Sequence, residues 1–580
     1  MPSLFHIFLT FSILPLALIV WSLSDLCRNY AKARVIGLPI TVRFITPGGP
    51  LWMIFSPVVI PIVAHLPFTK SFITKYKRGW ESRERYRPHE EFGELFIICT
   101  PSGNIIKVSN FEVADDILKR KDEFGRDLEA FAVLNIYGKN LATTEGKEWM
   151  RHRKVAAVTF TEKNAEMVWH ESLKEASQML EYWVARAKKP IRTLAQDTQI
   201  FSLNVLAAAL FGRSYPFEGK EESEAKNKSI GLDTKDGAFG YRDSIATILH
   251  MIVPIMVFGE KKLRDSWWLP KGWQKAGHAV ANFRDYITYL INEERSAIAR
   301  GATSSANLVT NLVRACEEED SGSLRTEKSV GSSAILTKDE IISDLFVFAF
   351  AGNDTTALSL AYILAELAAH PAIQDWISEE IHHYTDTDDV EKWDYATCAK
   401  LKRCWAVMYE TLRLSHPISQ LVKNTGAQAR TIRHQGNAYV IPSHTPVEIN
   451  LPSLSTMPSC WSTDSLEWNP KRFITPASSF EDEVLPSDTT SEFYPWAYSR
   501  LVCPGKRFSQ AELVGALAAL FRDHRVEPAL EPGENMDEAC HRVKKLSEDI
   551  EQRLLSEICE PHKIALKWSR TTDDGVRMEC

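Results

Sequence analysis

The stretch TKDEIISDLFVFAFAGNDTTALSLAYILAELAAHP, residues 337–371, predicts a single helix long enough to traverse the whole protein. In its first turn Thr337 and Glu340 are spaced as a capping box, in which each side chain accepts a hydrogen bond from the other residue's backbone N–H. The run that follows is almost entirely apolar. Pro371 marks its end, because the residue before a proline is disfavoured in the helical conformation. The stretch therefore predicts a helix that crosses the interior.

A polar cluster, Asn353-Asp354-Thr355-Thr356, interrupts this apolar helix. Buried polar groups are costly unless they find partners, and a threonine hydroxyl can bond to the carbonyl four residues earlier and bend the helix. Gly352, just before the cluster, would let a ligand approach the backbone closely. The cluster therefore indicates either a ligand-binding position or a kink packed against another helix.

Two other motifs place polar side chains at helical spacing. Trp149 and Arg153 are four residues apart, so they share a helix face, and both are hydrogen-bond donors that suit a carboxylate. A basic surface turn is the alternative for that motif. Glu410 and Arg413 are one turn apart. Together with Arg472, these two residues would form a buried structural network. The alternative is that Glu410 and Arg413 are an ordinary surface pair.

The segment FYPWAYSRLVCPGKRFSQAEL, residues 493–513, places Cys503 in a loop directly before another helical pattern. A helix N-terminus stabilises a thiolate and lowers the pKa of the thiol. Such a thiolate can ligate a soft metal, including haem iron. A nucleophilic cysteine would need a neighbouring basic histidine, and an inert buried cysteine is the third interpretation.

Composition narrows the class of protein. Of the 580 residues 44% are hydrophobic and 25% are charged, which is ordinary for a folded chain. The net charge of -7 argues against a nucleic-acid partner, because such proteins present a basic face. The ten cysteines include no CxxC pair, which indicates a reducing compartment.

Long helical patterns and a few strand-like segments, such as the hairpin pattern at 93–110, predict a mostly α fold with a minor β-sheet.

The N-terminus predicts a membrane anchor. Residues 4–23 contain no Asp, Glu, Lys or Arg and are numerous enough to cross a bilayer as a helix. Basic residues follow this run but do not precede it, which places the rest of the chain on the cytoplasmic side. A cleaved signal peptide is the alternative. A second apolar segment, 51–66, is short for a span and contains two prolines, so it would lie in the membrane interface or form a broken second span.

In their order and spacing these motifs resemble the cytochrome P450 family, the haem-thiolate monooxygenases. The resemblance covers residues 70–570, and the C-terminal part is most like fungal microsomal members, many of which tailor secondary metabolites. It implies the cytochrome P450 fold with an N-terminal transmembrane helix. The expected division is a membrane anchor region at 1–67 and a haem-thiolate catalytic domain at 68–580.

The resemblance also implies a role for each motif. Cys503 would be the thiolate ligand of haem b iron, and Asp354 with Thr355 would deliver protons to dioxygen bound there. The other implied roles are cofactor binding, by Trp149, Arg153, Gly352, Arg500 and Gly505, and bracing of the region behind the cysteine loop, by Glu410, Arg413 and Arg472.

The cysteine loop departs from the family pattern at two positions. Ser499 stands where the family has glycine, and Leu501 stands where it has an arginine that contacts a haem propionate. Arg500 or Lys423 would replace that arginine. Because Cys503 and the two residues after it match the family pattern, we expect the haem to bind.

The predicted activity is monooxygenation of a hydrophobic small molecule by a protein with a single-pass anchor in the endoplasmic reticulum membrane. Electrons would come from NADPH through a separate NADPH–cytochrome P450 reductase, docked on a basic face that includes Lys506 and Arg507. Alternatives are a haem-thiolate isomerase or dehydratase that needs no reductase, a non-catalytic haem-binding membrane protein, and a cysteine hydrolase. The segments expected by position to line the substrate site are 120–135, 240–258, 348–355 and the residues after Pro417.

Overall fold

Helices dominate the fold of the computed structural model. The structure describes residues 4–157, 160–186, 189–220, 244–249, 251–300, 307–310, 312–314, 336–485, 493–497, 502–571 and 577–578. The helices in the first half are α1 (Leu4–Ile36), α2 (Pro50–Ala64), α3 (Lys70–Tyr76), α4 (Trp80–Glu84), α5 (Arg87–Phe92), α6 (Phe111–Lys119), α7 (Leu128–Phe131), α8 (Gly146–Ala157), α9 (Glu162–Val184), α10 (Leu194–Phe211), α13 (Ile252–Asp265) and α14 (Lys271–Ala299). Those in the second half are α16 (Lys338–Ala369), α17 (Pro371–Tyr384), α18 (Lys402–Leu414), α19 (Leu451–Leu454), α20 (Pro458–Trp461), α21 (Lys506–Phe521) and α22 (Met536–Glu548).

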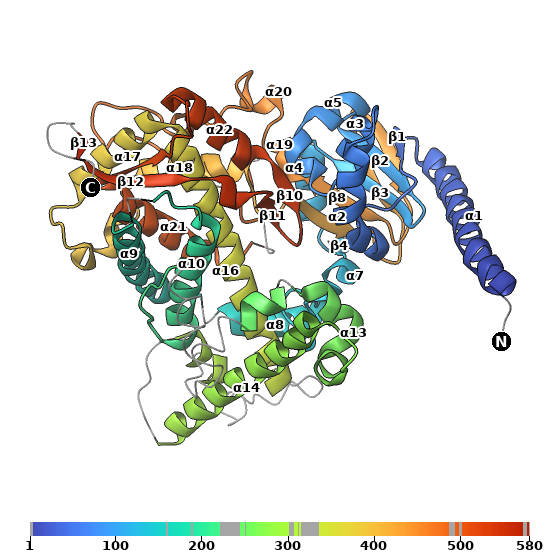
Figure 1. The fold of residues 1–580 in the computed structure, drawn as a ribbon, viewed down its shortest axis with the longest axis horizontal. Helices are drawn as coiled ribbons and strands as arrows, with labels where there is room; N and C mark the ends of the chain where they lie inside the picture. The colour runs from blue at the N-terminus through green and yellow to red at the C-terminus, as the bar shows by residue number, and fades with distance from the viewer. Residues whose placement is uncertain are drawn as a thin grey trace.

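The predicted long helix is α16, which runs through the centre of the molecule (Figure 1). Its capping box is present: the Thr337 hydroxyl accepts the Glu340 N–H, and the Glu340 carboxylate accepts the Thr337 N–H. Among the described residues α16 is the one helix long and apolar enough to cross a membrane. Because 78% of its apolar window is buried inside the protein, α16 is a core helix.

Strands form a minor part of the fold, as predicted. The largest sheet has the order β1-β2-β3-β8-β5-β4. The predicted hairpin at 93–110 is its β2–β3 pair, in which Leu95 lies opposite Val108. The strands of this sheet are β1 (Ile40–Val42), β2 (Leu95–Thr100), β3 (Gly103–Val108), β4 (Gly125–Arg126), β5 (Gln420–Asn424) and β8 (Pro446–Asn450). The smaller sheets contain β6 (Arg430–His434), β7 (Asn437–Ile441), β9 (His524–Pro528), β10 (Ile550–Gln552), β11 (Ser556–Ile558), β12 (Leu566–Thr571) and β13 (Arg577–Met578).

Tight packing of α21 against α9 holds the helix that follows the predicted cysteine loop. A Cβ atom at Gly515 of α21 would lie 3.3 Å from both the Ser172 Cβ and the Trp169 ring of α9. The glycine therefore allows the two helices to approach closely. α10 in turn packs against both α9 and α16, so the core ties the start of α21 to the central helix.

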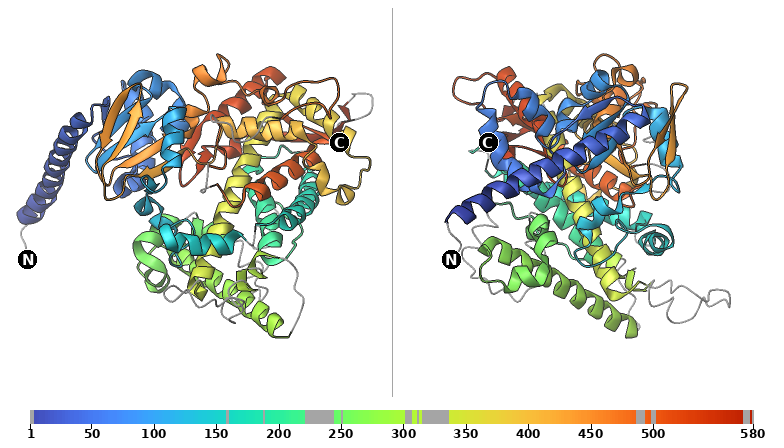
Figure 2. Two further views of the ribbon diagram at one scale, coloured as in Figure 1. Left: turned by 180° about the vertical axis from the view of Figure 1, so that it is seen from behind. Right: turned by 90° about the vertical axis from the view of Figure 1, so that its right-hand side faces the viewer.

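The N-terminal helix α1 extends away from the rest of the molecule in Figure 1 and in the left view of Figure 2. Its attachment near the C-terminal end includes Asn29, whose side-chain amide donates to the carbonyls of Thr100 and Pro101 at 3.0 Å. The second apolar segment forms one helix, α2, in which Phe55, Val58 and Ile62 are exposed.

Candidate active site

Cys503 lies just before the first turn of α21. Its backbone N–H donates to the Trp496 carbonyl at 2.9 Å, and Trp496 Nε1 donates to Ser509 Oγ at 2.8 Å. Both bonds tie the loop to the helix, so the packing of α21 also positions the thiol.

The Cys503 thiol combines exposure with desolvation. The residue is accessible to solvent, yet desolvation by the surrounding protein is the largest influence on the thiol and raises its pKa. The Gly505 backbone N–H and the Arg153 guanidinium act in the opposite direction and lower that pKa. A thiol that is desolvated but accessible suits a ligand held inside the protein better than an outer-surface role.

The polar cluster of α16 contains a carboxyl with an unusual acidity. Burial, and secondarily the Glu557 carboxylate, raise the pKa of Asp354 to about 7, while a 2.9 Å hydrogen bond from the Asn353 amide opposes the shift. The Thr355 hydroxyl donates to the Ala351 carbonyl at 2.6 Å, which is the helix-bending bond expected from the sequence. Ala351 is exposed although the ten residues before it are buried, and Gly352, Asp354 and Thr355 are half-buried, so the helix is accessible at this turn.

Phe160, which belongs to none of the sequence motifs, packs between α21 and α16. Its ring centroid lies 5.3 Å from that of Phe348 in α16 and 4.9 Å from that of Phe508 in α21. On another side of α16, a Cβ atom at Gly352 would lie 2.9 Å from Leu206 Cδ1. A larger residue at Gly352 would therefore have to displace the Leu206 side chain of α10.

Trp149 and Arg153 lie beside a group of further cations. The Trp149 Nε1 atom is buried and has no hydrogen-bond partner within the described structure. The Arg126 guanidinium lies 5.7 Å from the centre of the Trp149 ring. Burial lowers the pKa of Arg126, the Glu145 carboxylate acts in the opposite direction, and the Arg153 charge lowers the pKa further. Arg153 thus acts electrostatically on both Arg126 and Cys503.

Lys423 completes this group from the neighbouring strand, because Lys423 of β5 pairs with Arg126 of β4. The Lys423 side chain is buried, and burial together with the Arg126 charge lowers its pKa to about 8. No ion pair to Lys423 or Arg153 is present within the described ranges. Three buried or half-buried cations and an unpartnered indole N–H suit one or more carboxylates. Arg126 was missed from the sequence, since its position beside Trp149 follows from strand pairing.

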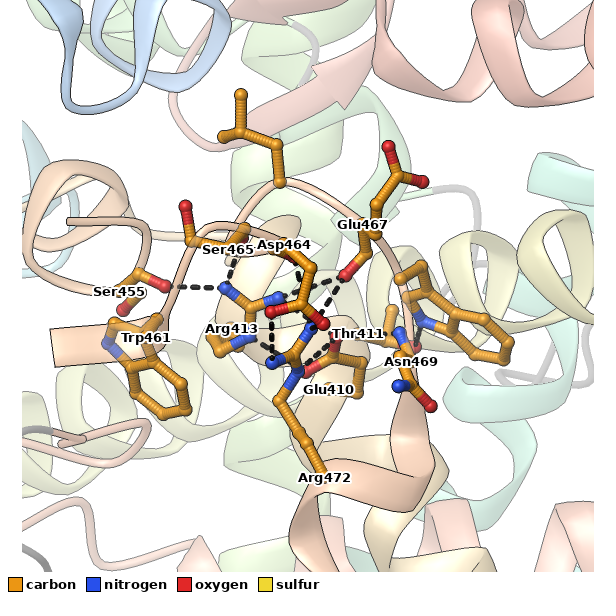
Figure 3. Close-up of polar contacts among 12 residues, drawn as sticks. Glu410, Thr411, Arg413, Ser455, Trp461, Asp464, Ser465, Glu467, Asn469 and Arg472 are labelled. Atoms are coloured by element: carbon orange, nitrogen blue, oxygen red, sulfur yellow. Dashed lines mark hydrogen bonds and ion pairs between the residues drawn. The ribbon is translucent and has the colours of Figure 1, made fainter. Parts of the chain in front are cut away.

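The structure brings Glu410, Arg413 and Arg472 together (Figure 3). Arg413 donates to both carboxylate oxygens of Glu410, at 2.7 and 2.9 Å, and Arg472 Nε donates to the same carboxylate at 3.0 Å. Arg413 also donates to the carbonyls of Ser455 and Ser465, at 2.7 and 2.6 Å. The group therefore fixes the segment that follows β8.

Some of the predicted site residues lie outside the described part of the chain. Arg500, with Ser499 and Leu501, lies outside the described residues, and so do positions 240–243 and 250 of the segment 240–258. The structure does bring together two of the other expected segments. Residues 120–135 contain β4, and the residues after Pro417 contain β5, which pairs with β4.

Comparison with known proteins shows a consistent likeness. The family model described as Cytochrome P450 matches residues 57–547. A cytochrome P450 monooxygenase of Arthrobotrys oligospora is 26% identical over 555 residues, covering 90% of this chain and 92% of that protein. The phomenoic acid biosynthesis cluster cytochrome P450 monooxygenase of Leptosphaeria maculans is 26% identical over 560 residues, covering 88% and 90%.

Solved structures agree with the predicted fold. A crystal structure of a cytochrome P450 aligns with a TM-score of 0.63 at 17% identity, covering 84% of this chain and 97% of that chain. A crystal structure of a cytochrome P450 haem domain aligns with a TM-score of 0.62 at 16% identity, covering 85% and 93%. The predicted mostly α cytochrome P450 fold with a minor β-sheet is therefore confirmed.

Proposed function

Because the chain belongs to the cytochrome P450 family, we propose that it is a membrane-bound haem-thiolate monooxygenase. Membership confirms the predicted family and the predicted oxidoreductase class, and it implies a haem-thiolate cofactor, a redox partner and a small-molecule substrate. In the proposed reaction one oxygen atom of O2 enters a hydrophobic small molecule. The electrons come from NADPH through NADPH–cytochrome P450 reductase.

One observation carries this proposal: Arg153 acts on a desolvated but accessible thiol, and in the same group lie further cations and an indole N–H that has no hydrogen-bond partner within the described structure. Arg153 acts on the Cys503 thiol and on Arg126, and Arg126 lies over Trp149 and beside Lys423. Haem b offers an iron for a thiolate and two propionates for cations and an indole N–H. We therefore assign Cys503 to the iron, and these four other residues to the propionates, with Arg500 and Gly505 as further cofactor-binding positions.

The α16 turn supplies the proton chemistry of the proposal. When bound, haem supplies the activation of O2 and the oxygen transfer. With a pKa of about 7, the Asp354 carboxyl can both take up and release a proton near neutral pH. The Thr355 hydroxyl, one residue further on, is the second member of the relay. We keep Gly352 as a cofactor-binding position beside them, with its Cβ side packed against Leu206.

Electrons enter, in this proposal, at the face next to the cysteine loop. Lys506 and Arg507 follow the proposed ligand Cys503 after two intervening residues, and Arg507 is exposed and paired with Glu162. A reductase with an acidic docking surface would find its positive partner there. Arg507 would exchange Glu162 for an acidic group of the reductase.

Membrane attachment, in this proposal, uses residues 1–67 and leaves residues 68–580 as the catalytic domain. The support is the uncharged run at 4–23 within α1 and the exposed apolar side chains of α2. We propose the endoplasmic reticulum membrane, where the reductase is also anchored. A hydrophobic substrate partitions into the same lipid. A role in secondary metabolism is supported by the name of the Leptosphaeria maculans relative.

The proposal is tested with the full-length protein, purified with its haem and compared with Cys503→Ser and Cys460→Ser variants. The wild type and Cys460→Ser are expected to give the reduced carbon-monoxide Soret band typical of thiolate ligation, and Cys503→Ser is expected to lose it. The enzyme is then combined with reductase, NADPH and candidate pathway intermediates, and mass spectrometry detects added oxygen. Product formed without NADPH would contradict monooxygenation and indicate an isomerase or dehydratase.

A further inference from the structure

A basic cavity of about 420 Å³ lies outside the candidate active site, between the α4–α5 region and α22. Five cationic side chains line it, against two carboxylates: Arg83, Arg85, Arg87, Lys544 and Lys545. The volume falls in the range of small-molecule binding sites. The proposed monooxygenase chemistry uses none of these residues.

Arg85 is the residue of this cavity that most clearly lacks a partner. It is only 8% exposed, and its side chain makes one long hydrogen bond within the described structure, from Nη1 to the Leu466 carbonyl at 3.5 Å. No carboxylate lies within ion-pair distance of it in the described part of the chain, and the acidic groups that act on it from further away are Glu548, which also lines the cavity, and Glu366. A buried charge without a close counter-charge is strongly unfavourable. A mobile anion in the cavity would remove that cost.

The remaining cations divide into two groups. Arg83 donates to three carbonyls, those of Lys77, Arg78 and Ile550, and so acts as a structural clamp. Lys544 pairs with the Glu467 carboxylate at 3.0 Å. Arg87 and Lys545 are exposed and have no ion pair within the described ranges. Three cations, one buried and two at the rim, therefore stay available to a ligand.

We propose that this cavity binds a phosphate-bearing anion, with its phosphate on Arg85, Arg87 and Lys545. Arginine presents a planar fork of donors that matches phosphate oxygens in pairs. A phosphate monoester carries up to two negative charges and three terminal oxygens, which fits three cations better than a single carboxylate does. The cavity also has room for an organic group attached to the phosphate.

Occupation of the cavity would also stabilise the region behind the cysteine loop. Arg85 bonds to the carbonyl of Leu466, and the next carbonyl, that of Glu467, accepts hydrogen bonds from both Arg413 and Arg472 at 3.2 Å. An anion on Arg85 therefore contacts the same short segment that the buried network holds. Ligand that binds the folded state alone raises the melting temperature as its concentration rises.

The test uses haem-loaded full-length protein titrated with inorganic phosphate or glycerol 3-phosphate at constant ionic strength, with chloride as the reference anion. Either phosphate is expected to raise the melting temperature of the wild type, and calorimetry gives the dissociation constant. Arg85→Met keeps the side-chain volume and removes the buried charge, so it is expected to fold. Arg85→Met and Lys545→Glu are each expected to weaken binding at least about tenfold.

Lys275→Glu is the matched control, because Lys275 is an exposed cation on α14, away from α22 (Figure 1). It is expected to keep the wild-type phosphate response. An equal response in the wild type, Arg85→Met and Lys545→Glu, or no response in the wild type, would overturn the proposal.

Vesicles identify the source of the phosphate. The full chain is reconstituted in phosphatidylcholine alone or with added phosphatidic acid, and soluble phosphate is titrated into both. If soluble phosphate raises the melting temperature in phosphatidylcholine vesicles but not in vesicles that contain phosphatidic acid, and this difference requires Arg85 and Lys545, the site binds a lipid headgroup. An equal response in both membranes assigns it to a soluble phosphate compound.

Discussion

His152 Nδ1 lies 2.6 Å from Asp344 Oδ2, and both side chains are buried where α8 meets α16. The other oxygen of Asp344 accepts the Leu141 N–H at 2.7 Å. Burial raises the pKa of the Asp344 carboxyl, and the hydrogen bond from His152 opposes this shift. α8 carries Trp149 and Arg153, whereas α16 carries Asp354 and Thr355. The pair therefore ties the helix that carries part of the proposed propionate site to the helix that carries the proposed proton relay.

Replacement of Asp344 by asparagine is expected to lower the free energy of unfolding by about 1–3 kcal/mol. Asparagine has only one side-chain oxygen, so it cannot accept hydrogen bonds with separate oxygens from both His152 and the Leu141 N–H. The exposed Asp339→Asn variant, in the first turn of the same helix, is the control and is expected to change stability by less than about 0.5 kcal/mol. Chemical denaturation measures both. Equal effects in the two variants would show that the pair contributes no stability.

Arg153→Leu is expected to lower the haem content of the purified protein without unfolding it, because a proposed propionate contact is lost. Lys423→Met should act in the same direction, since its buried ammonium lies in the same group of cations. The matched control is Lys147→Met, which removes an exposed cation from α8. The ratio of haem to protein, measured by absorbance, distinguishes them. Full haem occupancy in both site variants would exclude the propionate assignment.

Glu410→Gln is expected to destabilise the protein by about 3–5 kcal/mol, because Arg413 and Arg472 would keep their buried charges without a full counter-charge. Asp464→Asn removes a carboxylate that also pairs with Arg472 but is 47% exposed. Its expected cost is below about 1 kcal/mol. Thermal and chemical unfolding of the two variants measures the contrast. A loss from Glu410→Gln as small as that from Asp464→Asn would contradict a buried network.

Glu512 of α21 predicts a specific dependence of stability on pH. Burial raises its pKa from the ordinary value of 4.5 to about 8, and the neighbouring Ser202 hydroxyl only partly opposes the shift. Between these values the unfolded chain has released a proton that the folded chain keeps, so a rise in pH favours unfolding. The stability tied to neutral Glu512 is full at acidic pH and is lost as the pH rises through about 8.

Glu512→Gln removes this titration. Its stability relative to the wild type is expected to rise between pH 5 and pH 8, by at most about 1.4 kcal/mol per pH unit. The exposed Glu531→Gln variant is the control and should follow the wild type. Denaturation at a series of pH values gives the difference. A Glu512→Gln curve parallel to that of the wild type would show that Glu512 is ionised in the folded state.

Asp354→Asn and Thr355→Ala are expected to reduce product formation about a hundredfold or more, which is the usual contribution of positioned proton transfer. The haem content should stay unchanged, since neither side chain belongs to the proposed haem-binding group. Asp354→Asn should also remove any dependence of the rate on a group with a pKa of about 7. Turnover equal to the wild type in both variants would exclude the relay.

Several features follow from the amino-acid sequence alone, because each depends on residues that are neighbours in the chain. Thr337 and Glu340 cap α16 through bonds within one turn, and Pro371 prevents its continuation. Two apolar runs around a polar turn form the β2–β3 hairpin. The position of Cys503 before α21 and the i,i+3 pair of Glu410 with Arg413 are local patterns of the same kind.

Only the tertiary structure decided where distant charges meet. Arg126 and Lys423 become neighbours because β4 pairs with β5, and Arg85 and Lys545 line one basic cavity because folding brings the α4–α5 region and α22 to its walls. The raised pKa of Asp354 likewise requires burial and Glu557 of β11. Strand pairing and helix packing are sums of many weak contacts between remote segments, so no short pattern encodes them, and the electrostatics of both sites emerges only when the chain has folded.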